Sequence, residues 1–562
     1  MPRLLQLVAA LVVSVLLVLA VGGGELATYD AYIPGYDNTD HAGAVYLHHQ
    51  FIDRLAEGKL PGFDPLQLYP EGTWLVRLHG GNSLEMLVSW VLSWFLAWPA
   101  WFSWAHLAWL PLNLLAFLPL GRQLWGRTGP ALAAGAAWAV LPYHLGEIAS
   151  GRLTQVALVG LPLAVAGLLR VCERDGGWRD RLLAGGGFAL TGLGYWYYAI
   201  FLALCGPLFL VWGLVKRGRA AAVDLAWSAA VALGVVLPFA LPVLWPRLSG
   251  SWVPAPPLDP STANPVFDNA LQLFSAQPVQ LVGWFPWILL LGFAATAWKG
   301  QRRLLLVGLT LFCLICALGP AQYQGRTLWH LPYELLWRTV PLLDRLTHPG
   351  RWLGIGGLFL VLLAADGLAR WRPWATWVLP VGVIVQLWTA GNLPLGTWKQ
   401  ELPPVWKAVA AQEEQGALLV LPLLNSPLTC RWQPFHGRPM LGGMVEHMPW
   451  AWSPSFRELV SDSPMLMALY ALGRGKRTDV PVLQDDLARL RELGFDTVVL
   501  DRESWRWLSM MPGSDVNLPV ERLVTEALGT PLFRDDTGVV WRLPEQGRSG
   551  QAPPAPIELP PP

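Results

Sequence analysis

Apolar stretches long enough to cross a membrane recur along the first 391 residues, and they constrain the fold more than any other feature of this sequence. A membrane-crossing helix needs about 20 predominantly apolar residues. Charged residues make up 14% of the chain, whereas a soluble domain carries roughly 25%. The sequence therefore predicts a polytopic α-helical membrane protein. The eleven predicted crossings are 4–21, 101–121, 129–147, 154–170, 182–198, 199–215, 221–245, 283–298, 303–319, 353–369 and 374–391.

Tryptophan is more common than either other aromatic residue, with 33 Trp against 19 Phe and 12 Tyr. Trp favours the membrane–water interface because its ring is apolar and its N–H needs a polar partner. Several Trp residues lie in 84–121, which is too long for one crossing. We expect 84–99 to form a helix that lies at the interface or re-enters the membrane, and 101–121 to cross it.

Basic residues gather in every second loop, as expected when those loops face the cytoplasm. They are Arg3, Arg122, Arg127, Arg170, Arg174, Arg179, Arg181, Lys216, Arg217, Arg219, Lys299, Arg302, Arg303, Arg370 and Arg372. The other loops are 23–83, 148–153, 195–198, 246–282, 320–352 and everything after 391. This alternation predicts a cytoplasmic N-terminus and an extracytoplasmic C-terminus. Arginine far outnumbers lysine, which is typical of a GC-rich bacterium, so we expect its inner (cytoplasmic) membrane.

The composition changes near residue 395. Strands are predicted at 416–424 and 495–500, helices at 484–493 and 520–528, and a hairpin at 532–543. We expect three parts: a transmembrane domain over 1–394 with its outer loop at 23–83, a small extracytoplasmic α/β domain over 395–545, and a Pro-rich disordered tail over 546–562. A net charge of +1 argues against a nucleic-acid partner.

The long first outer loop carries eight acidic and three basic residues. It opens with Gly35-Tyr36-Asp37, a "GxD" pattern after the first helix. Further short patterns are Leu60 to Gly72 in the same loop, Gly151 to Gln155 before a crossing, Asp344 to Arg351 before a late crossing, and Gln433 to Pro439 followed by Gly442-Gly443. Together with the order of helix, acidic outer loop, many crossings and outer domain, these patterns resemble the GT-C superfamily of membrane glycosyltransferases.

Within that superfamily the chain looks like the YfhO-like and mannosyltransferase-like members. It lacks the WWD-type signature of oligosaccharyltransferases. The resemblance implies an inverting glycosyltransferase that moves a hexosyl or pentosyl group from a polyprenyl-phosphate carrier on the outer membrane face. The acceptor would be a glycan, a wall polymer or a protein, and membrane lipids would surround the enzyme.

A carboxylate in the outer loop would serve as the base in such a reaction, because it can accept the proton of an acceptor hydroxyl as the new bond forms. The GxD pattern makes Asp37 the first candidate and Asp40 the second. The two carboxylates would share a face if their segment were helical. The alternative is that one of them is a helix N-cap or a turn residue.

The departing lipid phosphate needs positive charge, and Arg binds phosphate through two parallel hydrogen bonds. Arg351 precedes the crossing 353–369, Arg345 and His348 are close to it in sequence, and Arg152 lies on another outer loop. We name all four as candidate carrier ligands. The alternative is an arginine that extends from a helix end into the lipid headgroups.

Two further loop residues are candidates for substrate contact. Asp64 precedes a proline and is expected to be a turn residue, with substrate contact as the alternative. His41 lies near both candidate bases, with His48 and His49 further along. Some GT-C relatives use a divalent cation and others none, so a metal here stays open, with interfacial histidines as the alternative.

Two other functions remain open. A transporter or flippase of lipid-linked glycans would carry ionisable residues in mid-membrane and broken, repeated helices. The predicted crossings are nearly free of charge, which favours chemistry at the interface. A non-catalytic membrane scaffold of GT-C ancestry, whose outer domain binds a partner, is the third possibility.

Overall fold

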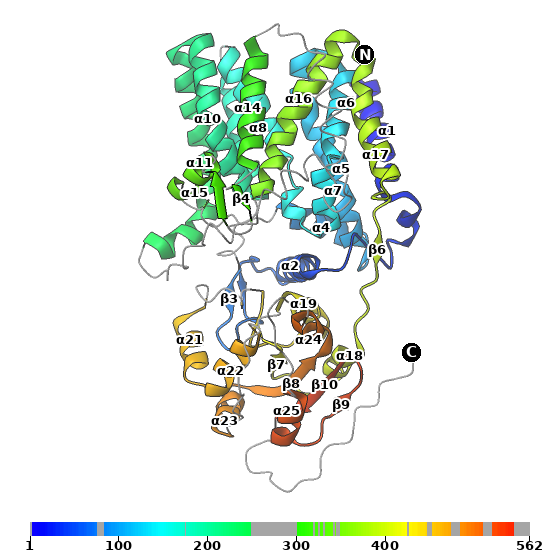
Figure 1. Ribbon diagram of the computed structural model, residues 1–562, viewed down its shortest axis with the longest axis vertical. Coiled ribbons are helices and arrows are strands. Elements are labelled where there is room, and N and C mark those ends of the chain that lie inside the picture. Colours follow the sequence, from blue (N-terminus) through cyan, green and yellow to red (C-terminus); the bar gives the residue numbers. More distant parts are fainter. Residues whose placement is uncertain are drawn as a thin grey trace. The chain divides into compact units, whose positions relative to one another are not determined.

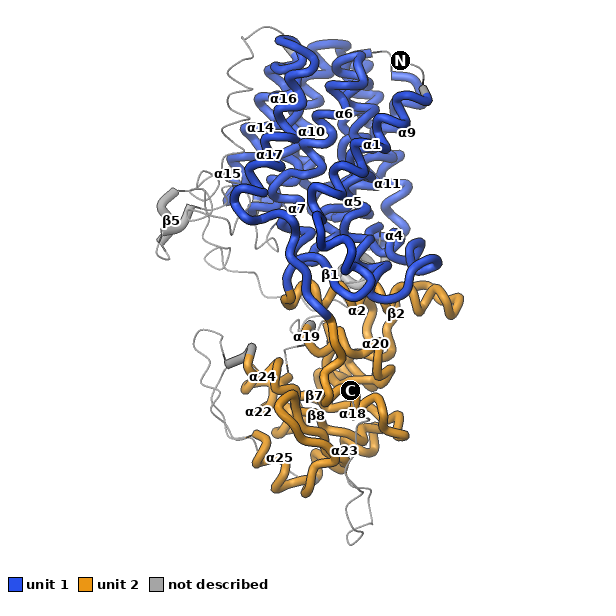
Figure 2. The backbone as a smooth tube through the Cα atoms, turned by 90° about the vertical axis from the view of Figure 1, so that its right-hand side faces the viewer, with its two compact units in different colours: residues 1–36, 80–244, 256–399 blue, residues 37–79, 245–255, 400–562 orange. Residues whose placement is uncertain are grey.

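The computed structural model describes residues 3–75, 84–174, 176–248, 301–317, 321–323, 326–329, 332–340, 343, 349–423, 426–444, 446, 452–473, 484–509 and 520–543. The chain forms two compact units, drawn in different colours in Figure 2. Unit 1 comprises 1–36, 80–244 and 256–399, and unit 2 comprises 37–79, 245–255 and 400–562. The predicted crossing 283–298, Arg345, His348 and the predicted tail 546–562 lie outside the described residues.

Unit 1 is a bundle of helices that lie side by side (Figure 1). Its α-helices are α1 (Arg3–Gly22), α4 (Leu84–Ser93), α5 (Ala100–Trp125), α6 (Thr128–Ala139), α7 (Pro142–Ala149), α8 (Gly160–Glu173), α9 (Trp178–Gly194), α10 (Trp196–Arg217), α11 (Arg219–Leu248), α14 (Gln301–Ala317), α15 (Pro332–Thr339), α16 (Leu353–Trp371) and α17 (Val378–Thr389). The 3₁₀ segments that bear on the site are η2 (Leu153–Gln155) and η6 (Pro349–Trp352).

Among the described residues, six helical segments are long and apolar enough to cross a membrane, which supports a multi-pass membrane protein. They are Leu4–Thr28, Ala100–Trp125, Leu153–Glu173, Trp196–Arg217, Arg219–Leu241 and Pro349–Trp371. The other described candidates are shorter. The stretch 129–147, expected to be one crossing, is two helices, because Leu141 is extended before Pro142, as a residue before proline tends to be.

The Trp-rich region divides as the sequence predicted. Helix α4 has ten residues, too few to cross a bilayer, and the 26-residue α5 follows it separately. Trp94 and Phe95, just after α4, are 60% and 77% exposed. Exposed aromatic side chains at the end of a short apolar helix fit the expected interfacial position.

One end of the unit 1 bundle is held by ion pairs between helix termini. Glu173 at the end of α8 accepts a 2.7 Å hydrogen bond from Arg302 at the start of α14. Asp224 on α11 pairs with Arg181 at 2.6 Å and Arg217 at 2.9 Å. These arginines come from three of the loops predicted to be cytoplasmic, so those loops lie at the same end of the bundle.

Unit 2 contains a four-stranded sheet of order β7-β8-β10-β9, formed by β7 (Ala417–Leu421), β8 (Phe495–Asp501), β10 (Gly538–Arg542) and β9 (Phe533–Arg534). The pair β7–β8 is parallel and the other pairs are antiparallel. Its α-helices are α2 (Thr39–Ala56), α18 (Pro404–Ala410), α19 (Ser426–Cys430), α20 (Gln433–His436), α21 (Pro454–Ser461), α22 (Pro464–Gly473), α23 (Gln484–Glu492), α24 (Arg502–Ser509) and α25 (Val520–Leu528). Strands β7 and β8, the β9–β10 hairpin and helices α23 and α25 overlap the elements predicted from the sequence, whereas the other helices of unit 2 were not predicted.

Both faces of this sheet are covered, which explains why every residue of β7 is buried. Leu419 and Leu421 belong to one core with residues of α22, α23 and α25. On the other face Leu418 packs in a second core, which includes Trp406 of α18 and Tyr46 of α2. Part of the first outer loop therefore belongs to the core of unit 2, whereas the sequence assigned the whole loop to the transmembrane domain.

Short strands complete both units. In unit 1, β1 (Ile33–Pro34) pairs with β6 (Thr397–Trp398), and β4 (Ala321–Tyr323) pairs with β5 (Arg326–Trp329). In unit 2, β2 (Phe63–Asp64) pairs with β3 (Thr73–Trp74).

Candidate functional site

Arg351 of unit 1 lies in η6, directly before α16. Its Cζ atom is 5.6 Å from the ring centre of Tyr195 and 5.9 Å from that of Tyr197. The buried Nε of Arg351 has no hydrogen-bond partner, and no ion pair to its guanidinium is found within the described ranges. Two tyrosine faces stabilise the cation, and no described residue accepts a hydrogen bond from its guanidinium.

A hydrogen-bonded group of polar side chains lies in the same part of unit 1. The Tyr143 hydroxyl donates to the Gln155 amide oxygen at 3.0 Å and is 3.1 Å from the Tyr198 hydroxyl. The Tyr198 hydroxyl donates in turn to the Gln155 carbonyl at 3.2 Å. These bonds fix η2 to the start of α10, beside the tyrosines that contact Arg351.

Arg152, another candidate carrier ligand, is engaged within unit 1. Its Nε is 2.8 Å from a carboxylate oxygen of Glu147, whose side chain is 11% exposed. An arginine held by a partly buried carboxylate is less available to an added anion. Of the two candidate arginines described, Arg351 is therefore the better placed to receive a phosphate.

The segment that leads to Asp37 is fixed to unit 1. Gly35 has a φ of +101°, and a Cβ there would collide with the carbonyl of Ala149, so the glycine of the GxD pattern is required by geometry. The Tyr36 N–H donates to that carbonyl at 3.0 Å, and its hydroxyl lies 2.6 Å from the Ser150 hydroxyl.

Asp37 itself belongs to unit 2, where its side chain is 40% exposed. Its Oδ1 accepts a 2.6 Å hydrogen bond from Nη1 of Arg431. The Nη2 of Arg431 donates to Oε1 of Glu503 at 2.9 Å. The Oδ2 of Asp37 has no hydrogen bond from any described residue.

Opposing effects set the proton affinity of Asp37. Burial raises the pKa of the carboxyl, the Arg431 guanidinium lowers it, and the negative charge of Glu503 raises it again, with a net increase. A carboxylate with a raised pKa and one free oxygen is suited to accept a proton.

Asp37 and Asp40 do not share a helix face, because α2 begins only at Thr39. Asn38 is the N-cap, and its side chain accepts a 2.9 Å hydrogen bond from the His41 N–H. The exposed Asp40 lies in the first turn of α2, where a negative charge favours the helix dipole. The stabilisation of the α2 N-terminus therefore explains an aspartate at position 40 without a catalytic role.

Asp64 has the local role expected of an aspartate before proline. Its carboxylate accepts a 2.9 Å hydrogen bond from the Leu66 N–H, two residues on. It also accepts a hydrogen bond from the Tyr46 hydroxyl of α2. The side chain is 1% exposed, and burial raises its pKa. Asp64 therefore joins β2 to α2.

The described residues contain no group of three His, Cys, Asp or Glu side chains that could hold a metal ion. His41 is fully buried on α2, and His48 is 2% exposed. His41 and His48 therefore lie in the interior of unit 2, and the described residues place no third ligand with them that would make a metal site.

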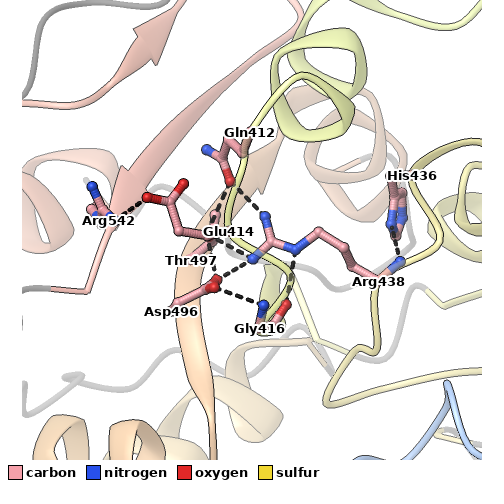
Figure 3. A network of polar contacts seen from close by, with 8 residues as sticks. All are labelled: Gln412, Glu414, Gly416, His436, Arg438, Asp496, Thr497 and Arg542. Atoms are coloured by element: carbon pink, nitrogen blue, oxygen red, sulfur yellow. Dashed lines mark hydrogen bonds and ion pairs between the residues drawn. The ribbon is translucent and has the colours of Figure 1, made fainter.

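The motif from Gln433 to Pro439 is structural (Figure 3). Arg438, 1% exposed, donates from Nε to the Gly416 carbonyl at 2.8 Å and from Nη1 to the Gln412 amide oxygen at 2.5 Å. Its Nη2 donates to the carboxylate of Asp496 and, at 2.9 Å, to the Thr497 hydroxyl. This one guanidinium ties the loop before β7 to β8.

Sequence reasoning missed Arg431 and Glu503. Arg431 follows a short apolar segment and Glu503 opens a helix, and neither position carries a motif. A buried arginine between two carboxylates is visible only once strands and loops from distant parts of the sequence are assembled.

Comparison with solved structures finds the fold in two complexes of the oligosaccharyltransferase AglB from Archaeoglobus fulgidus. One contains an inhibitory peptide and a dolichol-phosphate (12% identity, TM-score 0.50, 91% of this chain and 71% of that chain). The other contains Zn and sulfate (11% identity, TM-score 0.50, 91% and 70%). ArnT from Cupriavidus metallidurans bound to undecaprenyl phosphate also matches (12% identity, TM-score 0.41, 97% and 98%).

At this level of identity the likeness concerns the fold: over 91% of its length, this chain shares the fold of the oligosaccharyltransferase AglB. No family model matches the sequence, and no curated protein matches it either.

Proposed function

We propose that this protein is an inverting glycosyltransferase of the extracytoplasmic membrane face. It takes a sugar from a polyprenyl-phosphate carrier and transfers it to the hydroxyl of an acceptor. In this proposal Arg351 binds the carrier phosphate and Asp37 is the general base. The observation that carries the proposal is the Arg351 guanidinium, which lies at the start of a long apolar helix and forms no ion pair with any described carboxylate.

A phosphate on a lipid is the ligand that this arginine suits best. The guanidinium can donate two parallel hydrogen bonds to phosphate oxygens and stays charged in surroundings of low polarity. Tyr195 and Tyr197 leave these donors free. A solved structure of AglB, which shares the fold, contains a dolichol-phosphate, and a lipid phosphate is the chemistry that we transfer to this chain.

The chemistry balances with these two groups. The acceptor oxygen forms a bond to the anomeric carbon while the bond from that carbon to the phosphate oxygen breaks. The free Oδ2 of Asp37 takes the acceptor proton, and the phosphate leaves with the electron pair, stabilised by Arg351. Attack opposite the leaving group inverts the anomeric centre. No step is assigned to a metal.

The membrane arrangement proposed from the sequence completes this picture. The clustered arginines at one end of unit 1 support a cytoplasmic position for that end. We propose eleven crossings, a cytoplasmic N-terminus and an extracytoplasmic unit 2, in a bacterial inner membrane. Sugar transfer would then take place on the side where carrier-linked sugars meet envelope polymers.

The test measures free polyprenyl phosphate, which is a product whatever the sugar. Proteoliposomes of the full chain receive the lipid-linked sugars extracted from bacterial membranes together with envelope polymers, and the released lipid is quantified by mass spectrometry. Asp37→Asn should reduce the rate by about 10²- to 10⁴-fold, as expected for loss of a general base. Asp53→Asn, in the same outer loop, is the matched control and should keep the wild-type rate.

Two results would contradict the proposal. A wild-type rate in Asp37→Asn removes the base assignment. Carrier lipid that binds to the wild-type protein but never loses its sugar favours the transporter or scaffold instead.

A further inference from the structure

One buried arginine is shared by two carboxylates in unit 2. Arg431, between α19 and α20, is 2% exposed, whereas Asp37 and Glu503 are 40% and 41% exposed. The guanidinium also lies 4.5 Å from the ring centre of Trp432. A buried guanidinium with an aromatic contact and two charged partners has little freedom to move, so it presents both carboxylates in fixed positions.

The backbone at Glu503 is fixed by a separate set of hydrogen bonds. Asp501, the last residue of β8, accepts hydrogen bonds from the N–H groups of Glu503 at 3.0 Å and Ser504 at 3.3 Å. This carboxylate also accepts from the Ser504 hydroxyl at 3.2 Å. The aspartate thereby caps the start of α24, and Glu503 starts from a fixed point just after the C-terminal end of β8.

We infer that Arg431 and Glu503 are positioning residues for Asp37, supplied by the C-terminal part of the chain. Arg431 holds Oδ1 and thereby directs Oδ2 toward the acceptor, and Glu503 keeps this guanidinium from neutralising Asp37 completely. The inference rests on the proposed role of Asp37 as the base.

The charge balance gives the physical reason. An arginine paired with a single aspartate stabilises the ionised carboxylate and lowers its pKa by about 1–3 units, which makes it a poor base. Here one positive charge faces two carboxylates, so the group carries a net negative charge. Arg431 and Glu503 are the charged groups that act on Asp37, and Asp501 is in turn acted on by these two residues.

The arrangement assigns a catalytic purpose to unit 2. Glu503 lies in α24, directly after the interior strand β8 of its sheet, and the loop after α19 supplies Arg431. Arg431 contacts Asp37, which is 394 positions earlier in the chain, and Glu503 pairs with the same guanidinium. A mutation in this C-terminal part would therefore change proton transfer at Asp37 without touching either the carrier or the acceptor.

The pH dependence of polyprenyl-phosphate release by the full chain tests this inference. The acid limb of the pH–rate profile should follow the pKa of Asp37, because the base must be ionised. Glu503→Gln removes a negative charge and should move this limb to lower pH by roughly 0.5–1 unit. Arg431→Gln removes the positive charge and should move it to higher pH. A purely structural role predicts lower rates without opposite shifts.

Glu414→Gln is the matched control, because Glu414 also pairs with an arginine, Arg542, at a similar exposure in the same unit. Its profile should stay at the wild-type position. If Asp37→Asn is inactive but Glu503→Gln leaves the acid limb in place, the positioning inference is wrong and the base assignment stands. If Asp37→Asn is active, the proposed function fails first. If Arg431→Gln does not fold, the position of the acid limb in Glu503→Gln alone tests the positioning inference: a shift to lower pH supports it and an unchanged limb contradicts it.

Discussion

Replacing Arg438 by methionine tests whether one guanidinium holds the sheet of unit 2 together. Methionine keeps much of the volume and removes every donor. The Gly416 carbonyl and the Gln412 amide oxygen, which accept from Arg438 at 2.8 and 2.5 Å, then lose this partner. The carboxylate of Asp496, 25% exposed, loses its counter-ion. The native packing would remain, but the buried acceptors that now bond to Arg438 would lack these hydrogen bonds.

The size of the effect follows from this burial. Removing one member of a buried ion pair costs about 3–5 kcal/mol, and water reaches Asp496, which favours the lower end. We expect a loss of about 3 kcal/mol in the free energy of unfolding of unit 2. For a domain of this size the midpoint should fall by roughly 6–12 °C.

The assay is limited proteolysis of the detergent-solubilised full chain across a temperature series, with peptides of β7 and β8 quantified by mass spectrometry. Peptides of α8 in unit 1 serve as an internal reference. Arg542→Met is the matched control, because its ion pair with Glu414 is about one-third exposed and should contribute no more than about 1 kcal/mol. If Arg438→Met melts within about 2 °C of the wild type, the reasoning from burial is refuted.

Three further predictions concern the carrier, acid stability and topology. Arg351→Ala should weaken binding of undecaprenyl phosphate by about 10- to 100-fold, whereas the exposed Arg338→Ala should not; equal lipid recovery by mass spectrometry from both variants would contradict the phosphate role. Burial lowers the pKa of His436 from 6.5 to about 3, so stability is complete above pH 6.5 and falls as pH drops toward 3. Unit 2 should lose about 2 kcal/mol by about pH 5. His436→Asn should lack this loss in an acid unfolding titration, and an unchanged titration would be evidence against it. An alkaline phosphatase fused after residue 395 should be active, and a cytoplasmic signal there would overturn the proposed topology.

Local patterns in the sequence were sufficient to predict the four strands of the unit 2 sheet and two of its helices, α23 and α25. The strand at 495–501 and the helix at 520–528 follow from alternating and helical periodicity within a few residues. The division of 84–121 followed from its length and its tryptophans. Each of these features depends on neighbours in the chain, so one sequence suffices to predict it.

Contacts between segments that are far apart in the sequence could not be predicted from such local patterns. Nothing in 39–56 indicates that α2 packs against a sheet built more than 350 residues later, because an amphipathic helix has the same pattern on a membrane surface and on a protein. The pairing of Asp37 with Arg431 could not be foreseen for the same reason. The break within the expected crossing 129–147 has a local cause, because Pro142 has no backbone N–H and disfavours a helical conformation at Leu141.

Asp224 and Asp366, at one end of unit 1, each form ion pairs with two arginines, so either arginine of a pair can be lost while the carboxylate keeps a positive partner. Asp224 keeps Arg217 when Arg181 is lost, and Asp366 likewise lies within 3.1 Å of both Arg303 and Arg370. During evolution either arginine of a pair could therefore be replaced with little effect on stability, whereas loss of both would leave a carboxylate without a positive partner near the lipid. Surveys of single variants would rate all four arginines as dispensable, and their importance would emerge only in double-mutant cycles.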